Sequence, residues 1–98
     1  MGMIHVSSQN ILPDKIAIDK IDSSMSGSMV RAEGEISSKG FSGGNLFLTL
    51  KDGNSSIKVV KFNAEDRFSE GVNVVVEGEV AIYRGEMEII ASEIEKSE

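Results

Sequence analysis

Aromatic, hydroxyl and basic side chains share one face of the segment 45–51, which has the alternation of a strand. Phe47, Thr49 and Lys51 fall on that face, and leucines fall on the other, because successive side chains of a strand point to opposite faces. Phe47 can stack on a base, Thr49 can form a hydrogen bond, and Lys51 can bind a phosphate. Sites for single-stranded nucleic acid combine these elements, and each stacked base contributes about 1–3 kcal/mol. The segment is therefore predicted to carry a binding face.

Further basic and aromatic side chains flank this segment. Lys58 and Lys61 belong to the next strand-like run, and Lys39 and Phe41 project from a glycine-rich segment, 38–44, that is predicted to be a flexible loop. The predicted nucleic-acid-binding residues are Arg31, Lys39, Phe41, Phe47, Thr49, Lys51, Lys58, Lys61, Tyr83 and Arg84.

The aromatic residues also have structural interpretations. Phe47 could cover an apolar patch under the N-terminal segment, and Tyr83 could pack beside the last hairpin. Phe62 and Phe68 are assigned to the core, Phe62 because a bulge in its strand would turn the ring inward. With four Phe and one Tyr in the whole chain, the expected affinity is modest and sensitive to salt.

Catalytic chemistry finds little support in the residue types. The chain has no cysteine, and its single histidine, His5, lies near the N-terminus, which argues against a serine or cysteine triad. The pairs Glu77/Glu79 and Glu86/Glu88 are each two residues apart, so they point outward from strands like a solvated surface. No spacing typical of metal ligands is present. The sequence predicts a protein that is not an enzyme and that uses no cofactor or metal.

Charge is distributed unevenly along the chain. The net charge is −6, but residues 31–62 carry five basic and three acidic side chains, a net +2. Residues 63–98 carry three basic and ten acidic side chains, a net −7. This asymmetry favours one basic binding face on an otherwise acidic body. The alternative is a protein-interaction module whose acidic face docks a partner while no nucleic acid is bound.

Five strand-like segments position these side chains. They are 30–37, the two arms of a hairpin over 45–62 with Asp52-Gly53-Asn54 at its turn, 73–83 and 86–94. Glycines inside the first and fourth segments suit the bends of a small barrel.

A short helix is predicted between the third and fourth strands, because Asn63 can act as an N-cap and Gly71 as a stop. Five antiparallel strands in so short a chain would bury their apolar faces by closing on themselves. The predicted fold is therefore all-β, a five-stranded antiparallel OB-fold barrel with a short helix between strands three and four. A β-sandwich is the alternative, but it usually has more strands.

The barrel is predicted over residues 30–94, after a partly ordered N-terminal extension, 1–29, and before an acidic tail, 95–98. Pro13 prevents a helix from running through the extension. Its first dozen residues are expected to be loosely held. Residues 15–21 are expected to lie against the end of the barrel or to pair at its edge.

Several short motifs resemble the OB-fold of the nucleic-acid-binding "anticodon" type. They are Gly34-Glu35-Ile36-Ser37-Ser38, Gly44–Asp52, Ile57–Phe62 and Gly71–Gly78. The resemblance covers about residues 30–94 and includes the N-terminal domain of the exonuclease VII large subunit and the modules of archaeal replication protein A. It implies binding of single-stranded DNA, favoured here, or RNA. It also implies other domains or subunits of a larger replication, repair or nuclease protein as partners.

The chain length and its apolar runs set the remaining expectations. No apolar run approaches the length that crosses a bilayer, and the N-terminus lacks a charged-then-apolar signal pattern. A soluble, cytoplasmic protein without a membrane partner is expected. Because 98 residues leave no room for a nuclease domain, the chain is expected to be a domain of a longer protein or a stand-alone binder.

Overall fold

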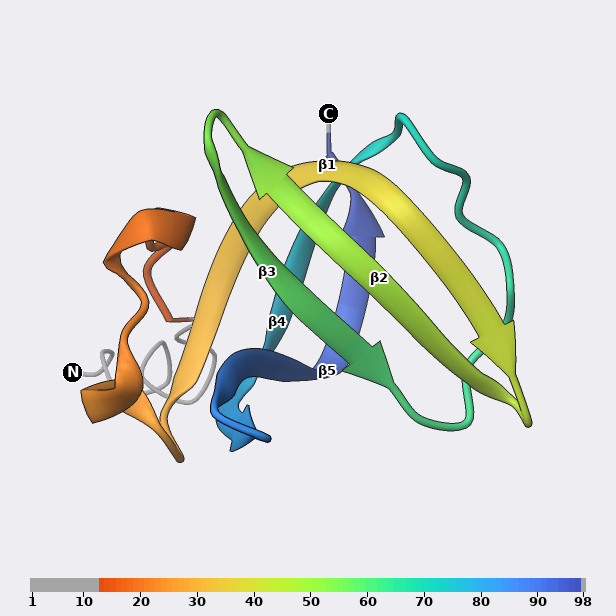
Figure 1. Cartoon of the computed structure of the whole chain (residues 1–98). Coiled ribbons are helices and arrows are strands. Elements are labelled where there is room, and N and C mark those ends of the chain that lie inside the picture. Colours follow the sequence, from red (N-terminus) through yellow and green to blue (C-terminus); the bar gives the residue numbers. More distant parts are fainter. Residues whose placement is uncertain (1–12, 98) are drawn as a thin grey trace, which may run out of the picture.

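Five strands form a closed barrel in the computed structural model, which describes residues 13–97 (Figure 1). The strands are β1 (Met29–Ser42), β2 (Asn45–Asp52), β3 (Ser55–Lys61), β4 (Asn73–Tyr83) and β5 (Glu86–Lys96). Two short 3-10 helices precede them, η1 (Ile18–Lys20) and η2 (Ser23–Met25). The expectations for the first dozen residues, including His5, lie outside the described residues.

One pair of neighbouring strands in the barrel is parallel. The strand order is β1-β2-β3-β5-β4, with β4 pairing to β1 to close the ring. All neighbours are antiparallel except β3 and β5, which pair in parallel from Lys58↔Glu88 to Val60↔Ile90. The predicted all-β, five-stranded barrel is confirmed, but its purely antiparallel form is wrong. A ring with an odd number of strands cannot alternate in direction at every step, so at least one neighbouring pair must be parallel.

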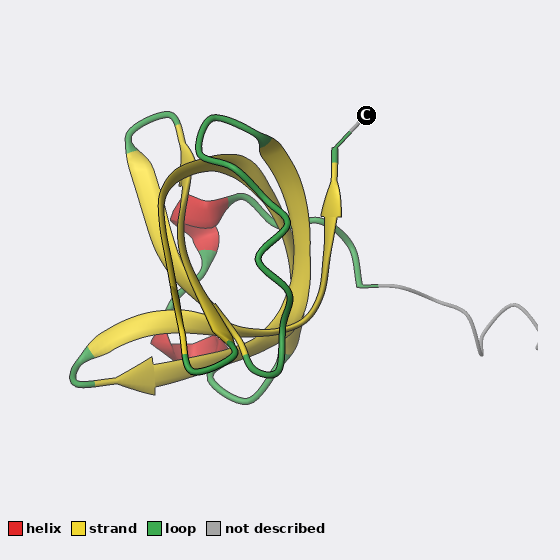
Figure 2. Cartoon of the chain, turned by 90° about the vertical axis from the view of Figure 1, so that its right-hand side faces the viewer, coloured by secondary structure: helices red, strands yellow, loops and turns green. Residues whose placement is uncertain are grey.

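The linker between β3 and β4, residues 62–72, is described throughout and contains no helix, so the short helix predicted there is wrong. Asn63 has a φ of 54°, in the left-handed region, whereas an N-cap residue has an extended backbone. Ala64 N instead donates a hydrogen bond to Gly44 O at 2.8 Å. The linker crosses the barrel from the end of β3 to the start of β4 (Figures 1 and 2). It has turns at 62–63 and 70–71 and no regular secondary structure between them.

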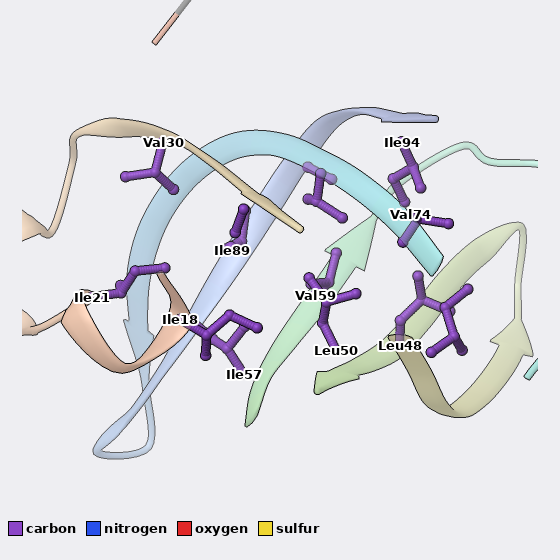
Figure 3. Packing of buried hydrophobic residues seen from close by; sticks show 14 of the residues in the cluster. Ile18, Ile21, Val30, Leu48, Leu50, Ile57, Val59, Val74, Ile89 and Ile94 are labelled. Atoms are coloured by element: carbon purple, nitrogen blue, oxygen red, sulfur yellow. The ribbon is translucent and has the colours of Figure 1, made fainter. Parts of the chain in front are cut away.

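Alternating strand residues fill the barrel, as their spacing predicts. In β2, Leu46, Leu48 and Leu50 are buried, whereas Phe47 is 43% exposed. Burying a large aliphatic side chain contributes roughly 1.5–3 kcal/mol relative to leaving it exposed. The core thus determines which side chains of each strand face outward. Its other inward residues include Val30, Ile57, Val59, Val74, Ile89 and Ile94 (Figure 3).

Two segments outside the strands complete the core. Ile18 and Ile21, from the N-terminal segment, are buried in it (Figure 3). The same segment is tied to β1 by a hydrogen bond of 2.8 Å from Ile16 N to Arg31 O. Phe68 of the linker is 8% exposed, which confirms its predicted place in the core.

Two strands are longer than predicted. β1 runs to Ser42, so most of the segment 38–44 is strand paired with β2 rather than a flexible loop. Only Gly43 and Gly44 form the turn, both with positive φ, which is the backbone that joins twisted strands in two-residue hairpins. β1 pairs with β4 over residues 29–35 and with β2 over residues 35–42, and its pairing with β2 shifts register after Ile36. At the other end of the chain, β5 continues to Lys96.

Candidate nucleic-acid interface

A groove of about 720 Å³ lies on the outer face of the β2–β3 hairpin. These two strands lie at the front of the barrel in Figure 1. Residues from all five strands and the first residue of the linker line it. We call it the β2–β3 groove. Five of the predicted binding residues line it, namely Lys39, Phe47, Thr49, Lys58 and Tyr83.

A polar row crosses the groove along cross-strand neighbours. Ser38 pairs with Thr49, Thr49 with Lys58, and Lys58 with Glu88. Each of β1, β2, β3 and β5 therefore contributes one polar side chain in register. Because neighbouring strands are about 4.8 Å apart, these residues form a continuous polar line.

An apolar row lies two residues further along each strand. Gly40 pairs with Phe47, Phe47 with Val60, and Val60 with Ile90. Val60 is only 9% exposed although it faces outward, because Phe47 and Ile90 flank it. A Cβ at Gly40 would have nothing within 4 Å, so the position opposite Phe47 is open. This row can act as a platform on which bases stack.

Phe62 also lines the groove and is 52% exposed, so its predicted place in the core is wrong. The pairing between β2 and β3 has no register shift, and without a bulge the alternation continues past the end of β3. Phe62 therefore lies on the same side as Lys58 and Val60. The regular spacing of these three residues along the sequence is the signal that could have identified Phe62 as a groove residue. By the same alternation, Lys61 falls on the other side and does not line the groove.

The β4–β5 hairpin brings Tyr83 to the groove. Arg84 and Gly85 form its turn with φ of 54° and 80°, as in two-residue hairpin turns. Tyr83 is 58% exposed, and the guanidinium carbon of Arg84 lies 5.3 Å from the centroid of its ring. Arg84 itself lines a smaller adjoining pocket of about 240 Å³ with Lys58 and Tyr83.

Both lysines of the groove contact carboxylates. Lys39 Nζ lies 2.7 Å from Asp66 Oδ1 of the linker, and Lys58 Nζ lies 3.4 Å from Glu86 Oε1 of β5. The carboxylates come from the acidic half of the chain, so folding brings part of that charge to the predicted basic face. Sequence spacing does not show this, because the partners are far apart along the chain.

Arg31, Phe41 and Lys51 lie outside the groove. Arg31 lines a second depression, of about 570 Å³, together with four glutamates. Phe41 is 43% exposed and pairs with Leu46 near the β1–β2 turn. Lys51 is exposed and pairs with Glu35 of β1. The structure therefore does not bring these three side chains together with the aromatic rings of the groove.

Glu33, in the second depression, contacts both ends of the described chain. Lys15 Nζ lies 2.7 Å from Glu33 Oε1, and Ser97 Oγ donates a hydrogen bond to Glu33 Oε2. These two contacts lower the pKa of the Glu33 carboxyl below its usual range, and the contact with Lys15 has the larger effect. The Glu33 side chain is 39% exposed, so solvent screens the interaction and its contribution to stability is small.

Replacing Glu33 with glutamine is expected to make the free energy of unfolding depend less on pH in the acid range. A lowered folded-state pKa stabilises the protein above the unfolded-state value of about 4.3, and this stabilisation is lost as pH falls through the folded-state pKa. Urea unfolding should show a deficit of at most about 1 kcal/mol in the variant near pH 6, and none well below both pKa values. Glu35→Gln, on the same strand, is the control. A deficit that is equal at both pH values would contradict the assignment.

Carboxylates are numerous on the described part of the barrel. Among residues 13–97, no group of three or more His, Cys, Asp or Glu side chains is placed to hold a metal ion. Over the same described part of the chain, no helix combines the length and the apolar character needed to span a membrane.

The groove and barrel can be compared with known proteins. Residues 30–97 match the family model described as OB-fold nucleic acid binding domain. The chain belongs to this family. The assignment confirms the resemblance that the motifs suggest, and it makes this OB-fold domain a nucleic-acid-binding one.

This OB-fold domain is similar to parts of several larger proteins. It is 43% identical to the exodeoxyribonuclease 7 large subunit of Nautilia profundicola over 77 residues, which cover 70% of this chain but 17% of the relative. The asparaginyl-tRNA synthetase from Pyrococcus horikoshii superposes with a TM-score of 0.74 at 21% identity, covering 87% of this chain and 23% of that one. A replication protein A heterotrimer bound to ssDNA gives a TM-score of 0.67 at 15% identity, covering 74% and 58%. At these identities the two solved structures share the fold alone.

Proposed function

We propose that this OB-fold domain binds single-stranded nucleic acid in the β2–β3 groove, with DNA favoured over RNA. The observation that carries the proposal is a set of three exposed aromatic rings in one groove. Phe47, Phe62 and Tyr83 are 43%, 52% and 58% exposed and all line it. Exposed rings are available for stacking, and each stacked base contributes about 1–3 kcal/mol.

The polar row supplies contacts to the nucleic-acid backbone. Thr49 can hydrogen-bond to a phosphate or sugar, and Lys58 can contact a phosphate. Lys58 already pairs with Glu86, and both side chains are more than 60% exposed. Such exposed ion pairs contribute about 0–1 kcal/mol, so a phosphate can replace the carboxylate at small cost. Among the described residues only two lysines line the groove, Lys39 and Lys58, so we expect few phosphate contacts, an affinity dominated by stacking and a shallow dependence on salt.

The relatives support a role in a larger DNA-processing protein. One is an exodeoxyribonuclease subunit of which this chain spans only 17%, and a solved neighbour is bound to ssDNA. We propose that the domain holds single strands for a replication, repair or nuclease protein in the cytoplasm. Other domains or subunits of that protein would be its partners and would perform any catalysis.

Fluorescence anisotropy with the full chain tests this function. The probes are labelled single-stranded DNA of mixed sequence, about ten nucleotides long to suit one OB-fold, the matching RNA, and the DNA duplex. We expect saturable binding of the single strands, tightest for DNA, that weakens as salt is raised. If no probe binds at low salt, the proposal is overturned, and a protein partner of the acidic surface becomes the better hypothesis.

Replacing Lys58 with glutamine is expected to weaken DNA binding roughly threefold. The negative slope of log affinity against log salt should become smaller in magnitude by about 0.7, the value for one phosphate contact on a single strand. Lys96→Gln removes the same charge outside the groove and is the matched control. The measurement is the same anisotropy titration repeated at several salt concentrations. Equal effects of the two substitutions would show that net charge alone matters and that Lys58 makes no local contact.

A further inference from the structure

Glu88 is the only acidic side chain among the described residues that line the β2–β3 groove. It is half-buried and ends the polar row beside Lys58. In residues 13–97 its carboxylate takes part in no ion pair or hydrogen bond, and Lys58 pairs with Glu86 instead. The alternating pattern alone assigns Glu88 to a solvated surface, whereas the structure places it in the groove.

A carboxylate at this position favours base edges over the nucleic-acid backbone. An ionised carboxylate accepts hydrogen bonds but donates none, and it repels phosphates. Base edges carry N–H donors, and the Watson–Crick edges are accessible in a single strand. Ile90 of the apolar row lies two residues from Glu88 on the same strand face, a spacing of about 7 Å. A base that stacks on the apolar row therefore has its edge within reach of the Glu88 carboxylate.

We propose that Glu88 determines base specificity and makes the groove prefer guanine, an inference that rests on the proposed function. Guanine N1–H and N2–H are two adjacent donors, which match the two oxygens of one carboxylate. The amino groups of adenine and cytosine each lie beside a ring nitrogen that accepts, so only one carboxylate oxygen gains a bond. Thymine and uracil present one N3–H between two carbonyl oxygens, which repel the carboxylate. The expected order is guanine, then adenine and cytosine, then thymine and uracil.

The test compares a labelled oligo-dT of about ten nucleotides with the same strand carrying one central dG. The wild-type chain should bind the dG-containing strand about tenfold more tightly, at the lower end of what a bidentate contact to a base provides. Glu88→Gln should reduce this ratio to about twofold or less, because the amide offers one donor and one acceptor. The same amide matches thymine N3–H and O4, so binding of oligo-dT should be unchanged or tighter.

Glu93→Gln is the matched control, because Glu93 is an exposed residue of the same strand outside the groove. It removes one negative charge and should leave the ratio between the two strands unchanged. If Glu88→Gln tightened both strands equally, as charge removal alone would, the inference would be overturned. Equal binding of the two strands by the wild-type chain would overturn the inference alone. If neither strand bound, the inference would fall together with the proposed function.

Discussion

Replacing Phe47 and Phe62 together with alanine is expected to weaken binding of single-stranded DNA about 100-fold. Both rings are about half exposed and line the β2–β3 groove, so neither is needed to fill the barrel. Losing one stacked base costs about 1–3 kcal/mol, and 2.7 kcal/mol is about a factor of 100 in affinity. Anisotropy with mixed-sequence DNA measures the loss, and an unchanged melting temperature would show that the fold is intact.

Phe41→Ala distinguishes the groove from the rest of the surface. Phe41 is 43% exposed, the same as Phe47, but its ring does not line the groove. We expect this substitution to change the affinity less than about twofold, since it removes no stacking platform. If Phe41→Ala weakened binding as much as the double substitution, the strand would bind near the β1–β2 turn. If the double variant bound DNA as tightly as wild type, the proposal that the strand binds in the β2–β3 groove would be wrong.

Replacing Gly78 with alanine is expected to lower the free energy of unfolding by about 3 kcal/mol, at the upper end of overpacking costs. An added Cβ would lie 2.3 Å from Ile90 O and 2.7 Å from Ala91 Cα. Both atoms belong to the backbone of β5, so no side-chain rotation relieves the clash. Gly78 also lies at the register shift between β4 and β5, where the strands are held in close approach.

Thermal unfolding measures this loss. For a domain of this size each kcal/mol changes the melting temperature by about 4–8 °C, so a fall of about 15 °C is expected. Gly40→Ala is the matched control, because a Cβ at Gly40 has nothing within 4 Å. Its free energy of unfolding should stay within about 0.5 kcal/mol of wild type. A Gly78→Ala variant as stable as the control would show that β4 and β5 can separate without cost.

Local patterns predicted the strands better than the segments between them. Alternation over 45–51 correctly assigned the leucines to the core and Phe47 to the outer face, because a strand has a fixed period of two. The helix predicted in the linker is absent, because helix signals such as Asn63 and Gly71 are weak local preferences. The tertiary structure overrides them. Here the chain must cross the barrel from the end of β3 to the start of β4, and it does so without regular secondary structure.

The candidate site was predicted in part. Phe47, Thr49 and Lys58 share an outer face that alternation alone identifies. Phe62 was missed because a bulge was assumed where the pairing is regular. Glu88 was assigned to the solvated surface because nothing local shows that β5 pairs with β3.

Where a strand is regular, as over 45–51, the sequence by itself determined which side chains face inward or outward, and with them the barrel and its family. The tertiary structure alone decided which outward side chains meet. It pairs Lys39 with Asp66, 27 residues away, and sets Glu88 beside Lys58 across a parallel pair of strands. The physical reason is that the face on which a side chain lies depends on the local period of two. Which side chains become neighbours across a barrel depends instead on strand order and register. These are settled by closing the whole ring around its core.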